Sequence, residues 1–204
     1  MVCVVKMTEV ASQLIEARKH NGDYTRTLAS QLGNMLELAE SLFGPRDRSY
    51  TVLGVEFIDG CPHIRYFGTC RHIIIQLGKP CLSEPARACY QLAHETIHLL
   101  SPTTHQNVNV LEEGLAAHFQ VWYMNKHYPP PYWPKSEIDW TVLQQPYDKA
   151  KILVEHFLKV DPNAIKRLRE QQPRLSQVTA AEIEHACSGL DRCDALALTA
   201  RFNQ

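Results

Sequence analysis

Two histidines four positions apart constrain the fold of this 204-residue chain more than any other feature of its sequence. They belong to the segment His94-Glu95-Thr96-Ile97-His98, an HExxH motif. On an α-helix, residues four apart lie on one face, one turn from each other, so both imidazoles can reach one metal ion. The motif therefore predicts a helix that borders a cleft, with Glu95 beside the first histidine, where it can carry protons.

The residues around the motif are typical of a partly buried helix over 84–100. Its small and apolar residues share one narrow face: Ala86, Cys89, Ala93, Ile97 and Leu100. Both histidines lie on the flank of that face, whereas a surface helix would place them opposite to it. We expect Ser83 to be the N-cap, with Pro85 in the first turn. We expect the motif to bind one zinc ion per chain. Catalytic zinc takes three protein ligands and keeps one position open, so a third ligand is expected besides the two histidines.

An acidic segment follows the motif in a second predicted helix, at about 109–124. It reads Val110-Leu111-Glu112-Glu113-Gly114. HExxH followed about fifteen residues later by a helical Glu-Gly resembles the gluzincins, the clan of zinc peptidases that includes thermolysin and the zinc aminopeptidases. The resemblance covers roughly residues 70–125. It implies a zincin-like fold, peptidase activity and a glutamate as the third zinc ligand.

Spacing alone allows either Glu112 or Glu113 to be that ligand. Glu113 is favoured because it lies away from the apolar face of its helix, which consists of Leu111, Leu115, Phe119 and Trp122. We expect the small residues beside it to let this helix approach the HExxH helix closely; they are Gly114, Ala117 and Val121. Glu112 would then accept a hydrogen bond from a ligand imidazole, or be solvated.

Three short runs rich in β-branched and aromatic residues predict strands at 50–58, 62–67 and 72–77. Asp59-Gly60 favours a hairpin between the first two. In gluzincins an edge strand above the zinc binds extended substrate, and the third run fits that role; it fits a buried central strand equally well. The remaining predicted helices lie at 8–20, 24–43, 146–170, 178–188 and 190–202.

These elements predict an α+β fold: a small, mostly antiparallel sheet packed on the HExxH helix, with a helical C-terminal lobe. Residues 1–125 would form the zincin-like catalytic region and 146–204 the helical lobe. Between them, 126–145 is a Pro-rich connector, because the segment Tyr128-Pro129-Pro130-Pro131-Tyr132-Trp133-Pro134 favours extended geometry. The connector could also form one wall of the cleft or bind a partner.

The resemblance also implies a His or Tyr that stabilises the oxyanion of the tetrahedral intermediate. Four residues are candidates, and the sequence does not choose among them: His105, Tyr123, Tyr132 and Tyr147. We expect His118 to pack rather than to bind metal, and we assign no role to His63 or His72. The GxMEN-type segment of the zinc aminopeptidases is absent from the sequence, so exopeptidase and endopeptidase activity are equally indicated.

Composition disfavours other classes of protein. The formal net charge is −1 and charges of both signs are interspersed, so nucleic acid is not an expected partner. No stretch approaches the roughly 20 apolar residues of a membrane span, and no secretory signal is recognised. The seven cysteines form no CxxC pair, which is typical of reduced thiols in a cytoplasmic protein.

The sequence therefore predicts a zinc-dependent metallohydrolase, specifically a peptidase that acts on a peptide or protein with metal-activated water. Glu95 would act as general base and then as general acid. One alternative is a catalytically inactive zincin-like module that binds peptide or protein, although such a module has no need of Glu95. Another is a regulatory zincin that cleaves one dedicated partner. The substrate and the oligomeric state are not indicated by the sequence.

Overall fold

The computed structural model describes residues 28–67, 71–102, 108–128 and 145–202, and these form an α+β fold. Helices are α2 (Leu28–Phe43), α3 (Pro85–His98), α4 (Val110–His127), α5 (Gln145–Val160), α6 (Ala164–Gln171), α7 (Ala180–Ala186) and α8 (Arg192–Thr199). Strands are β1 (Thr51–Ile58), β2 (His63–Phe67) and β3 (His72–Gly78), and short 3₁₀ helices occupy Lys79–Leu82 and Leu175–Gln177. The helix expected at 8–20 and the proline run at 129–134 lie outside the described residues.

The sheet is mixed, with strand order β1-β3-β2. Strand β1 pairs with β3 in parallel, and β2 pairs with β3 antiparallel. The expected hairpin between the first two strands is therefore wrong, and so is the expectation of a mostly antiparallel sheet. The physical reason lies in the burial of β3, which contains the run Ile73-Ile74-Ile75. Five of its seven residues are buried, against one of five in β2 and none of eight in β1, as expected when β3 is the central strand.

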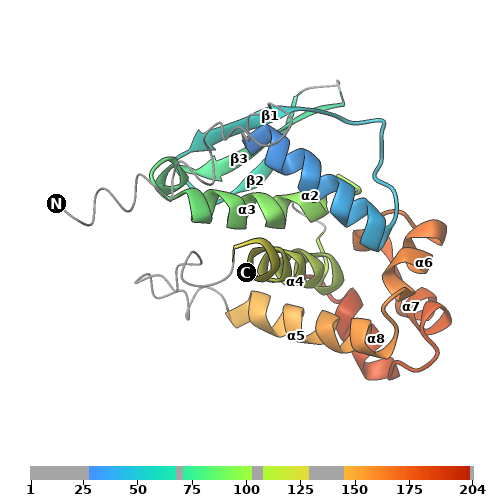
Figure 1. The fold of residues 1–204 in the computed structure, drawn as a ribbon. Helices are drawn as coiled ribbons and strands as arrows, with labels where there is room; N and C mark the ends of the chain where they lie inside the picture. Colours follow the sequence, from blue (N-terminus) through green and yellow to red (C-terminus); the bar gives the residue numbers. More distant parts are fainter. Residues whose placement is uncertain (1–27, 68–70, 103–107, 129–144, 203–204) are drawn as a thin grey trace.

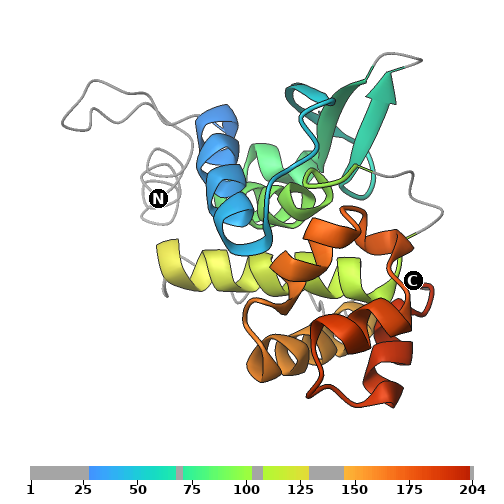
Figure 2. The same ribbon diagram turned by 90° about the vertical axis from the view of Figure 1, so that its right-hand side faces the viewer.

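Strand β3 also supplies the sheet's contribution to the core. Ile73, Ile75 and Leu77 alternate along it and are fully buried. Helices α2 and α3 cover one face of the sheet, α4 lies on the far side of α3, and α5 packs along α4 (Figures 1 and 2). The expectation that residues 72–77, now β3, form an edge strand is wrong, and the alternative, a central strand, is confirmed.

Two differences from the predicted helices have a local physical reason; the other ends differ by at most three residues, apart from the start of α2, where the described residues begin. Helix α3 begins at Pro85 with Glu84, not Ser83, as its N-cap residue, because Ser83 closes the preceding 3₁₀ helix. The single helix expected over 146–170 is two helices, α5 and α6. Pro162 lies between them, and Asp161 accepts a hydrogen bond from the backbone of Asn163, which together favour a turn.

A buried arginine joins the helical lobe to the sheet half of the molecule. Arg169 of α6 is 5% exposed. Its guanidinium donates hydrogen bonds to a set of backbone carbonyls and one hydroxyl: Phe43 O, Gly44 O, Pro45 O, Leu100 O, Pro173 O and Ser101 Oγ. Burial lowers the pKa of Arg169 to about 10 despite the opposing effects of Glu112 and Glu40, so the side chain stays charged at neutral pH. A cation here complements the C-terminal ends of α2 and α3, where carbonyls lack helical partners.

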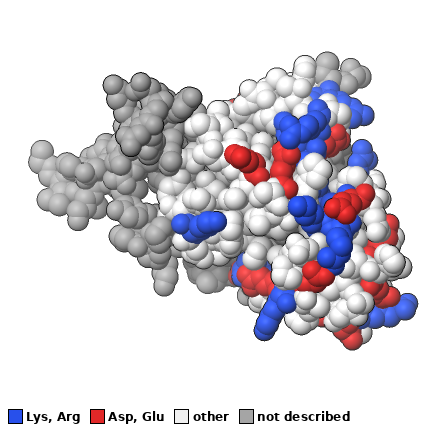
Figure 3. Space-filling model, turned by 45° about the vertical axis from the view of Figure 1, so that its right-hand side comes forward, with Lys and Arg blue, Asp and Glu red and all other residues white. Residues whose placement is uncertain are grey.

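Among the described residues, no helix combines the length and apolar character that a membrane crossing needs. On the face shown in Figure 3, acidic and basic side chains alternate rather than gather by sign. Charged side chains also pair at the surface of the described part of the chain; one such pair is Arg167 with Asp161.

Candidate metal centre

The three expected ligands converge where α3 and α4 pack together. Nε2 of His94 lies 3.3 Å from Oε2 of Glu113, and Nε2 of His98 lies 3.7 Å from its Oε1. One ligand atom from each residue can be chosen so that all three lie within 4.8 Å of one another. Ligands of a tetrahedral zinc, at bonds of about 2.0–2.2 Å, are roughly 3.3 Å apart. The two spacings to Glu113 are close to that value, and the third, at most 4.8 Å, would contract when all three residues bind one small cation.

Each imidazole is oriented by a hydrogen bond at its other nitrogen. Nδ1 of His94 lies 2.7 Å from Oε1 of Gln120, and Nδ1 of His98 lies 2.9 Å from Oε1 of Glu112. Both partners present an oxygen atom, which accepts a hydrogen bond from the Nδ1–H of its histidine. The proton therefore stays on Nδ1 of each ring, and Nε2 is left to face Glu113. The structure thus places Glu113 between the two histidines and Glu112 behind one of them.

Glu95 lies beside this cluster and is 3% exposed. Burial raises the pKa of Glu95, while His98 and His94 oppose that shift and Glu113 adds to it. Its Oε2 atom is buried without a hydrogen-bond partner among the described residues. A buried carboxyl group with a raised pKa and an uncommitted oxygen is suited to taking up and releasing a proton.

The imidazole of His98 is a second group in the cluster whose pKa is shifted. Burial by itself would lower the pKa of His98, but the carboxylates of Glu113, Glu112 and Glu95 outweigh it and raise the value to about 10. The metal-free protein therefore holds a proton on this imidazole at neutral pH. This proton stabilises the fold below the unfolded-state pKa of about 6.5, and the stabilisation is lost as the pH rises through about 10.

Binding of a metal to the cluster must displace that proton, because both need Nε2 of His98. We expect about one proton to be released per zinc at pH 7.5, and the apparent zinc dissociation constant to fall about tenfold per pH unit between pH 7 and 9. Calorimetric titration in two buffers of different ionisation enthalpy measures the proton count. A binding enthalpy that is the same in both buffers would contradict the protonated imidazole.

Helix α5 packs closely against α4 at Gly114, the residue that follows Glu113. Gly114 was expected to face the HExxH helix, but it lies against α5 instead: a Cβ atom there would be 2.4 Å from the carbonyl oxygen of Ala150 and 2.7 Å from Val154 Cγ2. Only glycine permits this approach. One turn before Ala150, the ring of Tyr147 packs edge-on against His94, with centroids 5.8 Å apart.

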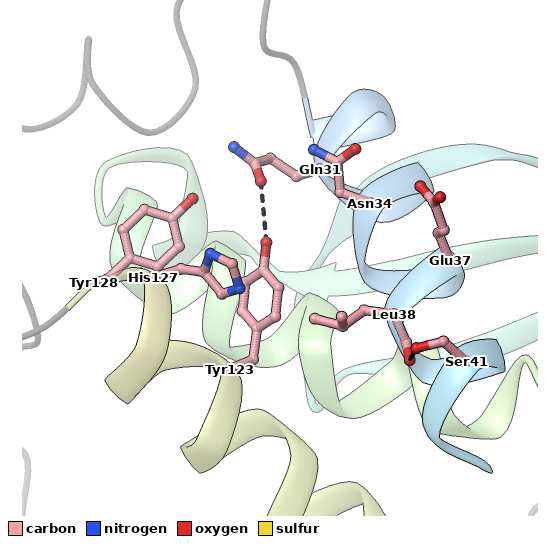
Figure 4. A pocket seen from close by; sticks show the side chains of 8 residues that line it. All are labelled: Gln31, Asn34, Glu37, Leu38, Ser41, Tyr123, His127 and Tyr128. Atoms are coloured by element: carbon pink, nitrogen blue, oxygen red, sulfur yellow. Dashed lines mark hydrogen bonds between the residues drawn. The ribbon is translucent and has the colours of Figure 1, made fainter.

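The other oxyanion candidates are elsewhere or outside the described residues. Tyr123 is ten residues beyond Glu113 on α4, about 15 Å along the helix. Its hydroxyl donates to Oε1 of Gln31 at 3.2 Å, and both residues line a separate pocket of about 440 Å³ between α2 and the end of α4 (Figure 4). His105 and Tyr132 are outside the described residues. Of the four candidates, Tyr147 is the one that the structure places beside the cluster.

The other described histidines of the sequence analysis, which are His63, His72 and His118, are not part of the three-residue cluster. His118 pairs with Glu155 of α5 at 3.4 Å, and its pKa is lowered, chiefly by burial. His72 is exposed at the start of β3. His63, at the start of the edge strand β2, has the smallest of the five effects on the pKa of Glu95, which it lowers.

Sequence reasoning missed two residues of this centre. Gln120 lies seven positions after Glu113, two turns along the same helix, and that spacing could have indicated it. Phe202 could not have been found, because it lies far along the chain; its ring packs 4.9 Å from that of Tyr147.

The chain was compared with protein-family models, with curated proteins and with solved structures, and no match was found. The resemblance to the gluzincins therefore depends on the motif residues themselves.

Proposed function

We propose that this protein is a zinc-dependent peptidase in which His94, His98 and Glu113 hold the metal. The observation that carries the proposal is the convergence of these three side chains within 4.8 Å, next to a buried Glu95. Two imidazole nitrogens and one carboxylate match the ligand set of zinc hydrolases, so the residues fit the ion. When bound, zinc would polarise a substrate carbonyl and lower the pKa of a water molecule to about 7.

Glu95 is the proton carrier in this proposal. Its Oε2 atom makes no hydrogen bond among the described residues, so it can accept a proton from the attacking water. The same carboxyl group then delivers the proton to the leaving nitrogen, for which its raised pKa is an advantage. Tyr147 is placed beside His94, where a hydroxyl could stabilise an oxyanion.

The substrate in this proposal is an extended peptide. Strand β2 is at the edge of the sheet, and its outer backbone groups can pair with another strand. Helix α3, which carries Glu95, contacts β2, so this edge strand lies beside the helix of the proposed site. Peptide bonds of a bound strand would then lie near the cluster.

Metal content and metal removal test the proposal. The purified protein should carry close to one zinc per chain, and a quenched-fluorescence peptide library should be cleaved by it. Treatment with a chelator should abolish cleavage, and added zinc should restore it. His94→Ala should bind no zinc, whereas His118→Ala, which alters a histidine outside the cluster, should retain it. A wild-type protein that takes up no zinc, even when zinc is supplied, would refute the proposal.

A further inference from the structure

A pocket of about 440 Å³ lies apart from the metal cluster, between α2 and the end of α4 (Figure 4). Both helices pack on α3. The volume is within the range of pockets that bind small ligands, which begins at about 300 Å³. Helix α2 supplies mostly polar side chains and α4 supplies aromatic ones. The two sides meet where the Tyr123 hydroxyl donates to Oε1 of Gln31 at 3.2 Å.

Only half of the Gln31 amide has a hydrogen-bond partner. Gln31 lines the pocket and is 2% exposed. Its Oε1 atom accepts from Tyr123, whereas its Nε2 atom is buried without a partner among the described residues. Buried donors are nearly always paired in proteins, because an unpaired one is destabilising. A bound molecule that brings a carbonyl oxygen to this wall of the pocket would supply the missing acceptor.

The α2 side of the pocket also offers acceptors at its rim. Asn34, Glu37 and Ser41 are exposed and follow each other at three and four positions, so they share one face of the helix. The Ser41 hydroxyl donates its hydrogen to Leu38 O at 2.7 Å, which leaves the oxygen to accept. None of the eight lining residues is a lysine or an arginine to pair with the Glu37 carboxylate. A positively charged ligand with several donors would complement this rim.

The α4 side of the pocket presents aromatic rings. The rings of His127 and Tyr123 have centroids 4.4 Å apart and an angle of 31° between their planes. His127 is exposed and Tyr128 is half-buried, so both side chains keep accessible surface at the pocket. A guanidinium group is planar, stacks on aromatic rings, and has five donors and no acceptor. An ammonium group is compact and strongly hydrated, so the pocket suits arginine better than lysine.

We infer that this pocket binds an arginine residue of a peptide or protein partner. The guanidinium would pair with Glu37 and contact the rings of α4, and a carbonyl of the same residue or its neighbour would accept from Nε2 of Gln31. The inference is independent of the proposed function, because Tyr123, which lines the pocket, is about 15 Å along α4 from Glu113. Binding at the pocket should therefore need no metal.

Three small probes test the pocket in the full-length protein. N-acetyl-arginine amide has the guanidinium and peptide carbonyls, N-acetyl-citrulline amide is its neutral counterpart, and methylguanidinium has the cation alone. In NMR titrations the arginine probe should shift amides of α2 and the end of α4, with a dissociation constant on the order of 1 mM. The citrulline probe should bind about fivefold more weakly, because it cannot form the exposed ion pair with Glu37. Methylguanidinium should bind about tenfold more weakly, because it lacks the carbonyls.

Three variants make the result specific. Glu37→Gln should reduce the preference for the arginine probe over the citrulline probe to about twofold or less. Glu170→Gln, which alters an exposed glutamate of α6 outside the pocket, should keep the full preference. Gln31→Met should weaken both of these probes by about threefold or more and leave their ratio unchanged, because both have the carbonyls. Treatment of wild type with a chelator should change none of these constants.

Several outcomes would overturn the inference. These are equal binding of the arginine and citrulline probes to wild type, an unchanged preference in Glu37→Gln, no binding at about 20 mM, or shifts confined to residues outside the pocket. If methylguanidinium binds as tightly as the arginine probe, the pocket takes a free cation and the peptide partner is refuted. If Gln31→Met does not fold, the comparison of Glu37→Gln with Glu170→Gln still decides, because both change exposed residues.

Discussion

Replacing Glu95 with glutamine should abolish most turnover and leave the metal in place. Glu95→Gln keeps the size of the side chain and its capacity to hydrogen-bond but removes the base. The three proposed ligands and the buried apolar residues of α3 are untouched, so folding and zinc content should equal those of wild type. Peptide hydrolysis should fall by roughly 10²–10⁴-fold, the usual contribution of general acid–base catalysis. Steady-state kinetics with zinc-loaded protein provide the measurement.

The matched control for this variant is Gln91→Glu, placed one turn earlier on the same helix. Gln91 accepts a hydrogen bond from the backbone of Gly78 through its Oε1 atom, a contact that a glutamate can also make. It should therefore change turnover little. If Glu95→Gln hydrolyses peptides as fast as wild type, Glu95 is not the proton carrier. If neither wild type nor Glu95→Gln hydrolyses any peptide although both bind zinc and peptide, the proposed peptidase is refuted. The protein would then be a non-catalytic module that binds peptide.

A second large effect should separate the two neighbouring glutamates of α4. Glu113 and Glu112 are 6% and 4% exposed, so Glu113→Gln and Glu112→Gln perturb equally buried carboxylates. Glu113→Gln removes a proposed ligand and should weaken zinc binding by far more than 100-fold. Glu112→Gln alters only the partner of His98 Nδ1, for which a loss of roughly 10–100-fold is expected. Competition with a fluorescent zinc chelator measures both constants.

The order of the two losses decides the assignment. The opposite order would make Glu112 the ligand and Glu113 its neighbour. Equal, small losses in both variants would mean that neither carboxylate binds the metal, and the resemblance to the gluzincins would lose its third ligand. Thermal unfolding of the metal-free variants shows whether any loss reflects misfolding.

Much of the candidate site could be predicted because its information is local. His94 and His98 are four residues apart, and a helix alone brings them together. Glu113 required one further step, the packing of α4 on α3, and the apolar face of α4 indicated which side it occupies. The buried residues of α3 include Ala86, Cys89, Ala93 and Ile97, as its sequence pattern predicted.

The failures concern contacts between distant segments. Asp59-Gly60 is a good hairpin turn by itself, but it cannot reveal that β3 displaces β2 as the neighbour of β1. Gly114 was correctly recognised as a point of close approach, yet its small size does not say which helix approaches; the answer was α5. Phe202 is held at the start of α4 by its backbone hydrogen bond to Val108 and by the neighbouring bridge between Arg201 and Asn109, and no short-range pattern records that pairing.

The buried guanidinium of Arg169 couples the unfolding of the helical lobe to that of the sheet half. If α6 detached, the carbonyls of Phe43, Gly44 and Leu100 would each lose a charged donor, and a cation would leave the ends of two helices. Opening the helical lobe alone is therefore costly, so the lobe and the sheet half should melt as one cooperative unit. Any cation that binds at His98, one turn or less from Leu100, then stabilises α6 as well, and protection of α6 amides from hydrogen exchange would rise on its binding.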